Sequence, residues 1–202
     1  MTELEKLCAE MALCRDCDLA KTRNKVVPGE GREDAKIVFI GEAPGWHENQ
    51  QGRPFVGPAG HFLEDLLGSI GLQRQDVYIC NVVKCRPPEN RDPFPLEIRS
   101  CAQWLDQQLE LINPKVIVTL GRYSMARFFP GESIGKIHGT ARKVGEITCF
   151  AMYHPAAALH QQSLRKVIEA DMLKLPGILA ELERAQQSTQ REEIPPKQLS
   201  LF

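Results

Sequence analysis

Short apolar runs alternate with helix-like segments along most of this chain, and that alternation constrains its fold more than any other feature. The runs that we expect to be strands are residues 36–40, 77–80, 116–120 and 147–153. Between them, the spacing of apolar residues predicts helices over residues 58–70, 96–112 and 121–129. Strands that alternate with helices build a parallel sheet covered on both faces. The sequence therefore predicts an α/β fold, a three-layer α/β/α sandwich around a central four-stranded parallel sheet.

The two ends of the chain differ in composition. A short amphipathic helix is predicted over residues 3–13, and residues 156–184 are mainly helical in pattern, with an interruption near Pro176-Gly177. Residues 130–145 are polar and favour a loop or a hairpin. From residue 186 to 198 the chain has almost nothing apolar to bury. We therefore expect one folded domain over residues 1–184 and a flexible tail over residues 185–202.

Charge and cysteine content narrow the class of protein. The net charge of −1 gives no overall basic character, so any nucleic-acid contact must come from a local patch. No apolar run approaches the length of a membrane span, and the acidic N-terminus is unlike a secretory signal. We expect a cytoplasmic protein. Its seven cysteines, an odd number, favour metal ligands or free thiols over a disulfide framework.

Four of the cysteines lie at loops or near the ends of predicted elements: Cys14, Cys17, Cys85 and Cys101. The first two form a C-x₂-C pair, and the other two are far away in sequence. Such a set can converge into a four-thiolate site for zinc or for an iron–sulfur cluster, and the spacing does not separate the two. The alternative is a chance pair plus packed small hydrophobic residues, which is the interpretation that fits Cys8, Cys80 and Cys149.

Polar and aromatic residues follow several predicted strands. Glu42 comes directly after the first strand, Asn81 after the second and His154 after the fourth, while Phe55 lies in a Gly/Pro-rich loop. Each alone has an ordinary explanation: a solvated turn residue, a turn-forming Asn, a structural His or a hydrophobic plug. In open α/β sheets, however, ligands bind at the carboxyl ends of strands. Together the four residues predict a ligand site at that edge.

At these residues the sequence resembles the family-four uracil-DNA glycosylases, the iron–sulfur branch of that superfamily. The resemblance covers about residues 10–180 and rests on motifs in one order: the C-x₂-C pair, Gly41-Glu42-Ala43-Pro44-Gly45, Arg53-Pro54-Phe55-Val56-Gly57, Asn81-Val82-Val83-Lys84-Cys85-Arg86-Pro87-Pro88, Asn90-Arg91 and His154-Pro155-Ala156-Ala157. It implies a uracil-DNA glycosylase fold and a structural [4Fe–4S] cluster on Cys14, Cys17, Cys85 and Cys101. It also implies a monofunctional enzyme that cleaves uracil from DNA in base excision repair.

The resemblance further implies how the residues share the work. Uracil is flipped out of the strand into the pocket. Phe55 stacks on it, and the amide of Asn81 pairs with its O4 and N3–H. His154 stabilises the departing uracil anion at O2. Glu42 orients or activates the attacking water and stabilises the cationic sugar.

Four more positions match the family. The backbone at Gly41 and Ala43 shapes the site, and Glu48 and Asn90 stand at positions with a function in the family.

The chain also departs from related branches. His138, in the segment Gly135–Gly139, stands where one branch carries a histidine that traps the abasic sugar covalently, yet this chain lacks that branch's longer basic insertion. We interpret His138 and Lys136 as DNA-contacting loop residues, and Leu159 as support for the loop that enters the strand. Candidate phosphate contacts are Arg86, Arg91, Lys136, Arg142 and Arg165. Lys84 is interpreted as a phosphate contact or a scaffold residue.

The last five residues resemble the pentapeptide that binds the bacterial sliding clamp, with anchors Gln198, Leu199, Leu201 and Phe202. The resemblance as a whole predicts a monomer that acts on uracil-containing DNA, with the clamp as its protein partner and no membrane. The alternative functions are a protein that binds uracil or abasic DNA without catalysis, and one that becomes covalently linked to abasic DNA through His138.

Overall fold

The computed structural model describes residues 1–192, and its centre is one mixed, mostly parallel sheet with six strands in the order β1-β3-β2-β4-β6-β5. The strands are β1 (Glu30–Gly31), β2 (Ile37–Gly41), β3 (Tyr78–Asn81), β4 (Val116–Leu120), β5 (Thr140–Val144) and β6 (Ile147–Met152). Strands β3, β2, β4 and β6 run parallel, whereas β1 and β5 are antiparallel edge strands. The predicted four-stranded parallel sheet is therefore the centre of a wider one.

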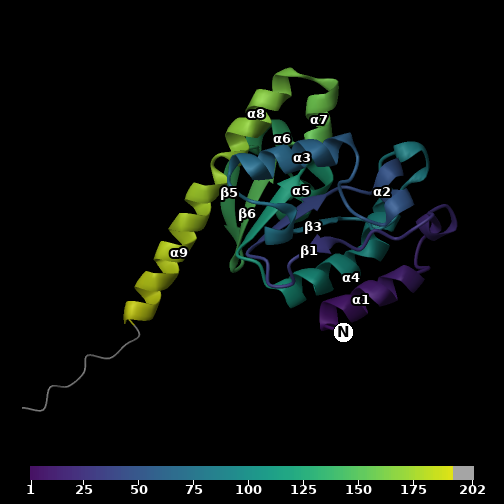
Figure 1. The fold of residues 1–202 in the computed structure, drawn as a ribbon, viewed down its shortest axis with the longest axis horizontal. Helices are drawn as coiled ribbons and strands as arrows, with labels where there is room; N and C mark the ends of the chain where they lie inside the picture. Colours follow the sequence, from purple (N-terminus) through teal and green to yellow (C-terminus); the bar gives the residue numbers. More distant parts are fainter. Residues whose placement is uncertain (193–202) are drawn as a thin grey trace, which may run out of the picture.

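Helices lie on both sides of the sheet (Figure 1). The α-helices are α1 (Glu3–Leu13), α2 (Trp46–Gln51), α3 (Pro58–Ser69), α4 (Pro95–Ile112), α5 (Arg122–Phe128), α6 (Ile134–Ile137), α7 (Pro155–His160), α8 (Ser163–Met172) and α9 (Leu175–Glu192). Three short 3₁₀ helices are η1 (Asp18–Lys21), η2 (Arg74–Asp76) and η3 (Pro88–Asn90).

The core has two halves because alternate residues of a strand point to opposite faces of a sheet. Val38 and Ile40 of β2 pack with residues of α1, α4 and α5 on one face. Ile37 and Phe39 of the same strand pack with residues of α3, α7, α8 and the start of α9 on the other. Every residue of β2, β3 and β4 is buried, as expected for strands covered on both sides. The three-layer α/β/α prediction is confirmed.

The structure also holds elements that the sequence pattern did not reveal. The edge strand β1 has only two residues, and α2 and α6 are one to two turns long. Such short pieces carry too few residues to show a periodic pattern. Residues 140–144 form the strand β5, which turns through Gly145 into β6, so the hairpin alternative for residues 130–145 is the one present.

The C-terminal helical region has two breaks, one of them close to the predicted interruption near Pro176-Gly177. Breaks occur at residues 161–162 and 173–174, and Pro176 lies in the first turn of α9. There the missing N–H of proline has no helical partner to lose, so the residue is tolerated. The helix α9 continues to Glu192, through the first part of the expected tail, and extends away from the body of the molecule (Figure 1). In residues 1–192, no helix is long and apolar enough to cross a membrane.

Candidate active site and cysteine site

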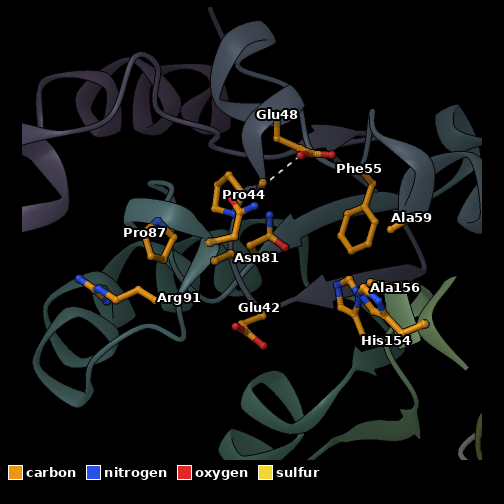
Figure 2. Close-up of a pocket in the computed structure, with 14 residues that line it drawn as sticks. Glu42, Pro44, Glu48, Phe55, Ala59, Asn81, Pro87, Arg91, His154 and Ala156 are labelled. Carbon is orange, nitrogen blue, oxygen red and sulfur yellow. Dashed lines mark hydrogen bonds between the residues drawn. The ribbon is translucent and has the colours of Figure 1, made fainter. Parts of the chain in front are cut away.

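A cavity of about 370 Å³ opens at the carboxyl edge of the parallel strands (Figure 2). Glu42 enters it directly after β2, Asn81 is the last residue of β3, and His154 precedes α7 after the end of β6. The predicted residues that line the cavity are Glu42, Ala43, Glu48, Phe55, Asn81, Asn90 and His154. Sequence reasoning therefore identified a set of residues that the fold brings together from four separate segments.

Gly41 does not line the cavity, but it makes room for two residues that do. A Cβ atom at Gly41 would lie 2.4 Å from Oδ1 of Asn81 and 2.7 Å from Cζ of Phe55. Both distances are far inside van der Waals contact, so a side chain here would displace Asn81 and Phe55. Gly41 also pairs with Asn81 in the β2–β3 ladder. The ladder extends further, since the amide of Val82 donates to the carbonyl of Gly41 at 3.1 Å.

The side chain of Asn81 carries the clearest mark of a binding group. Asn81 is buried, and its Oδ1 atom has no hydrogen-bond partner within the protein. An unpaired buried acceptor costs on the order of 1–3 kcal/mol, so such atoms are rare unless a ligand or water pairs with them. Since Asn81 lines the cavity, the free acceptor is available to a donor bound there.

Phe55 stands in a strained loop that is held from two sides. Its φ is +52°, a left-handed conformation that residues other than glycine seldom adopt. Arg74, on η2, donates from Nη1 to the carbonyl of Phe55 at 2.8 Å and from Nη2 to that of Pro54 at 2.6 Å. Glu48 accepts from the amides of Val56 and Gly57 at 2.9 and 3.0 Å. These contacts hold the backbone in a conformation that it would otherwise leave.

The conformation of the Phe55 loop also depends on close contact between its backbone and the first turn of α3. A Cβ atom at Gly60 would lie 1.9 Å from the carbonyl oxygen of Phe55, so only glycine fits there. Glu48 also accepts from the amide of Gly45 at 3.1 Å, which ties the Phe55 loop to the Pro44-Gly45 turn (Figure 2). The ring of Phe55 then stacks on that of His154, with centroids 5.4 Å apart and planes 26° apart.

His154 is kept neutral and in one tautomer. Burial lowers its pKa to about 4, although the nearby Glu48 raises it in part. Nδ1 of His154 accepts a hydrogen bond from the amide of Ala156 at 3.1 Å. Because a neutral imidazole has a single N–H, that proton is then on Nε2. His154 can therefore donate a hydrogen bond into the cavity at neutral pH without carrying a positive charge.

Glu42 has a raised pKa suited to proton transfer near neutral pH. Burial is the main cause, repulsion from Asp92 adds to it, and attraction to Arg122 opposes it; the resulting pKa is about 7. A carboxyl group with this pKa exchanges protons with water at the pH at which most enzymes work. Its environment therefore fits a general base better than a solvated turn residue.

The remaining candidates lie around or outside the cavity. Asn90 lines it and accepts from Nε of Arg86 at 2.7 Å. Arg91 also lines it, but its guanidinium is held by both carboxylate oxygens of Glu97, at 2.7 and 2.9 Å. Arg142 and Arg165 likewise pair with acidic neighbours, whereas Lys136 and Leu159 are exposed. The paired arginines would have to exchange partners to hold a phosphate.

His138 is not among the residues that line the cavity. Its Nδ1 lies 2.7 Å from Oδ2 of the buried Asp171, and its ring lies 4.8 Å from that of Tyr153. Asp171 also accepts from Nζ of Lys174 at 2.8 Å. His138 is thus part of a local polar cluster that anchors the loop before β5.

The four predicted cysteine ligands meet at a second, smaller cavity. Cys14 ends α1, Cys17 precedes η1, Cys85 follows β3, and Cys101 lies in the second turn of α4; all four line it. Two N–H groups already point at sulfur: Nη1 of Arg23 lies 3.3 Å from Sγ of Cys85, and the amide of Lys84 lies 3.3 Å from Sγ of Cys101. The indole N–H of Trp104, another lining residue, is buried without a partner.

The chemistry of these thiols depends on whether a metal binds them. Burial raises the pKa of Cys101 to about 11 and also raises the pKa values of Cys17 and Cys85. They stay protonated at neutral pH unless a metal replaces the protons. Among the described residues, no group of three or more His, Cys, Asp or Glu side chains is arranged to hold a single metal ion. All four cysteines line the same cavity.

Sequence reasoning missed Arg74, and it left two interpretations of Lys84 open. Arg74, which holds the Phe55 loop, lies 19 residues further along the chain, and no local pattern links the two. Lys84 was interpreted as a phosphate contact or a scaffold residue, but its side chain is only 2% exposed. A phosphate contact is therefore wrong, because the ammonium group faces the protein interior.

Comparison of the sequence with known proteins identifies the class of protein to which this fold and this pocket belong. The profile of the Uracil DNA glycosylase superfamily matches residues 28–173, more than two thirds of the chain. A type-4 uracil-DNA glycosylase of Archaeoglobus fulgidus is 46% identical, over 87% of this chain and 92% of its own length. Those of Sulfurisphaera tokodaii and Thermotoga maritima are 49% and 44% identical, over 87% and 82% of this chain and 84% and 89% of theirs. The chain belongs to the type-4 uracil-DNA glycosylases.

Proposed function

We propose that this uracil-DNA glycosylase, an enzyme of base excision repair, uses Glu42, Phe55, Asn81 and His154 to remove uracil from DNA. The observation that carries the proposal is the unpaired, buried Oδ1 of Asn81 in a cavity that also contains Glu42 and His154. A buried acceptor without a partner is costly, so its presence in this cavity supports a ligand that offers a donor at that point. The target nucleotide must leave the base stack to reach such a cavity.

Asn81 selects uracil by the direction of its hydrogen bonds. Oδ1 accepts from N3–H of the base, and Nδ2 donates to O4. Cytosine offers the opposite pattern at both positions, so it would leave two buried groups unpaired. Phe55 supplies the flat surface on which the base rests. The ring of His154 is stacked on Phe55 as well. A base that stacks on Phe55 beside His154 would therefore present its edge to His154.

His154 stabilises the leaving group. Cleavage of the C1′–N1 bond leaves negative charge on the uracil ring, including O2. The Nε2–H of a neutral His154 donates to O2, and the hydrogen bond strengthens as that charge develops. A uracil anion held in this way leaves without prior protonation, so no second acid is required.

Glu42 acts on the other side of the bond. As a carboxylate it accepts a proton from water that attacks C1′, and its charge favours the cationic character of the sugar in the transition state. A pKa of about 7 leaves the carboxylate available at and above neutral pH. Glu48 has a different role, since its Oε1 accepts from the amides of Val56 and Gly57 in the Phe55 loop and its Oε2 accepts from the amide of Gly45.

A [4Fe–4S] cluster on Cys14, Cys17, Cys85 and Cys101 fits the second cavity. All four cysteines line that cavity, and four cysteine thiolates are the usual ligands of such a cluster. The buried indole N–H of Trp104 would find an acceptor in the cluster or in a cysteine sulfur. The cluster would tie α1, α4 and the segment after β3 together. Glycosidic hydrolysis needs no electron transfer.

The C-terminal residues extend the proposal to a partner. Gln198, Leu199, Leu201 and Phe202 lie outside the described residues and carry the pattern of a sliding-clamp ligand. Binding through the end of the chain would keep the enzyme near DNA and raise its effective concentration there. Removal of residues 198–202 should abolish clamp binding and leave excision from short oligonucleotides unchanged.

The experiment that tests the proposed mechanism is excision from oligonucleotides that contain one uracil, thymine or cytosine, followed by alkali and a denaturing gel. The wild type should break only the uracil strand, and Glu42→Gln should lower the rate by 10²–10⁴-fold with DNA binding retained. Full activity in Glu42→Gln would contradict the role of Glu42. A protein-linked band with no breakage would instead favour covalent trapping through His138.

A further inference from the structure

Lys84 is buried in an environment that is unusual for a charged residue. The buried charged side chains in residues 1–185 are Lys84, Glu97 and Asp171. Glu97 pairs with Arg91, and Asp171 pairs with Lys174. Lys84 has no carboxylate within ion-pair distance in the described part of the chain. An isolated buried ammonium group is costly, which points to a compensating negative charge nearby.

The contacts of Lys84 extend in two directions. Its Nζ donates to the backbone carbonyl of Asn81 at 2.9 Å and to Oε1 of Gln108 at 2.5 Å. Gln108 is fixed in turn, because its Nε2 donates to the hydroxyl of Tyr78 at 2.8 Å and to the carbonyl of Pro28 at 2.9 Å. On the other side Lys84 lines the cysteine cavity, and its backbone amide donates to Sγ of Cys101 at 3.3 Å. Lys84 therefore lies between the residue that selects the base and the residues that would hold the cluster.

We propose that Lys84 is a positioning residue that couples the cysteine site to base recognition, by holding the carbonyl of Asn81 while its ammonium group balances the negative charge of the cluster. The inference rests on the proposed function, in the roles given there to Asn81 and to the four cysteines. A [4Fe–4S] cluster bound by four thiolates carries net negative charge, and a cation close to such a cluster raises its reduction potential. Each partner then keeps the other in place: the cluster makes burial of Lys84 tolerable, and Lys84 holds the end of β3.

The coupling predicts two linked effects of Lys84→Met, which removes the charge and keeps most of the length. In protein whose iron and sulfide content is verified, the affinity for free uracil, measured as competitive inhibition, should weaken about tenfold, because the carbonyl of Asn81 loses the hydrogen bond that holds it. The reduction potential of the cluster should move to a more negative value, because the added electron loses a nearby positive charge. A residue with only a packing role would change neither quantity in loaded, folded protein.

Arg23→Met is the matched control. Arg23 also lines the cysteine cavity and donates to Cys85, but no contact links it to Asn81. This variant should shift the reduction potential without weakening the affinity for uracil. Equal loss of uracil affinity in both variants would show a general effect of disturbing the cysteine site and would overturn the specific role of Lys84.

Gln108→Glu keeps Lys84 in place and puts a carboxylate against its ammonium group, which covers the case in which Lys84→Met fails to fold. Neutralising the charge in this way should move the reduction potential in the same negative direction. An unchanged potential in Gln108→Glu, or unchanged uracil affinity in loaded Lys84→Met, would overturn the proposal. Neither result would affect the proposed function, which fails separately if the wild type does not excise uracil.

Discussion

His154 and His138 lie at the same edge of the sheet, but they differ in their hydrogen bonds and in their access to the cavity. His154 has one nitrogen held by the Ala156 amide and the other free in a cavity beside Asn81, which also has a free acceptor. His138 is held by the buried Asp171, which Lys174 also contacts. One histidine retains its capacity for a ligand, and the other uses it within the fold. The free acceptor of Asn81 beside His154 therefore distinguishes this cavity, and the presence of a histidine alone does not.

The comparison is tested most strongly by replacing each histidine with alanine. His154→Ala should lower the rate of uracil excision by about 10²–10³-fold, the usual cost of losing a donor to a developing anion. His138→Ala should leave the rate within about threefold, because its ring lies outside the cavity. Single-turnover kinetics on a uracil oligonucleotide measures both. A large loss in His138→Ala, or an adduct in the wild type that this variant cannot form, would show that His138 reaches the sugar.

The surroundings of His154 offer a second test, through the loop that presents Phe55. Arg74→Met should lower kcat/KM for uracil by about tenfold, because the strained loop loses two hydrogen bonds and the ring shifts by a fraction of an ångström. Free uracil should bind more weakly in the same variant. Arg53→Met is the control. Arg53 directly precedes Pro54 in the sequence, but its guanidinium donates to the carboxylate of Glu30 and not to the carbonyls of Pro54 and Phe55. Equal losses in both variants would contradict a specific role for Arg74.

A smaller effect is expected from pH. Glu42 must be ionised to accept a proton, and its pKa is raised to about 7, so excision should increase as pH rises from 6 to 8. His154 stays neutral over that range because its pKa is lowered to about 4. Asp92→Asn removes a charge that raises the pKa of Glu42, so the profile should move to lower pH, with a gain on the order of twofold at pH 6.5. A profile that is flat from pH 6 to 8 would contradict Glu42 as the base.

Among these variants, replacement of Asp171 should have the smallest effect on activity. Its main effect should be on the stability of the fold. Asp171→Asn weakens two charge-assisted contacts, to His138 and Lys174. We expect the free energy of unfolding to fall by about 1–3 kcal/mol, with excision at 25 °C nearly unchanged. Urea denaturation and the oligonucleotide assay measure the two quantities on the same preparation. A large loss of activity without loss of stability would contradict the view that His138 and Asp171 serve only the fold.

The parts of the fold that the sequence could predict are those with local causes. Continuous apolar runs indicate buried parallel strands, and the residue after such a strand lies at the ligand-binding edge whatever the details of packing, as Glu42 and Asn81 do. The rest depends on contacts between distant segments. No local signal shows that Arg74 holds Phe55, or that Lys84, a residue type usually found at the surface, is buried. The raised pKa of Glu42 likewise depends on burial and on Asp92, which the chain brings near only on folding.

One consequence follows from the ladder that joins β2 to β3. The amides of Val82 and Val83 donate to the carbonyls of Gly41 and Glu42, so Glu42 and Asn81 stand on the same hydrogen-bonded backbone as the core. Such backbone opens only when the whole domain unfolds. Thermal inactivation and thermal unfolding should therefore follow one curve, and these two amides should be among the slowest in the protein to exchange with deuterium.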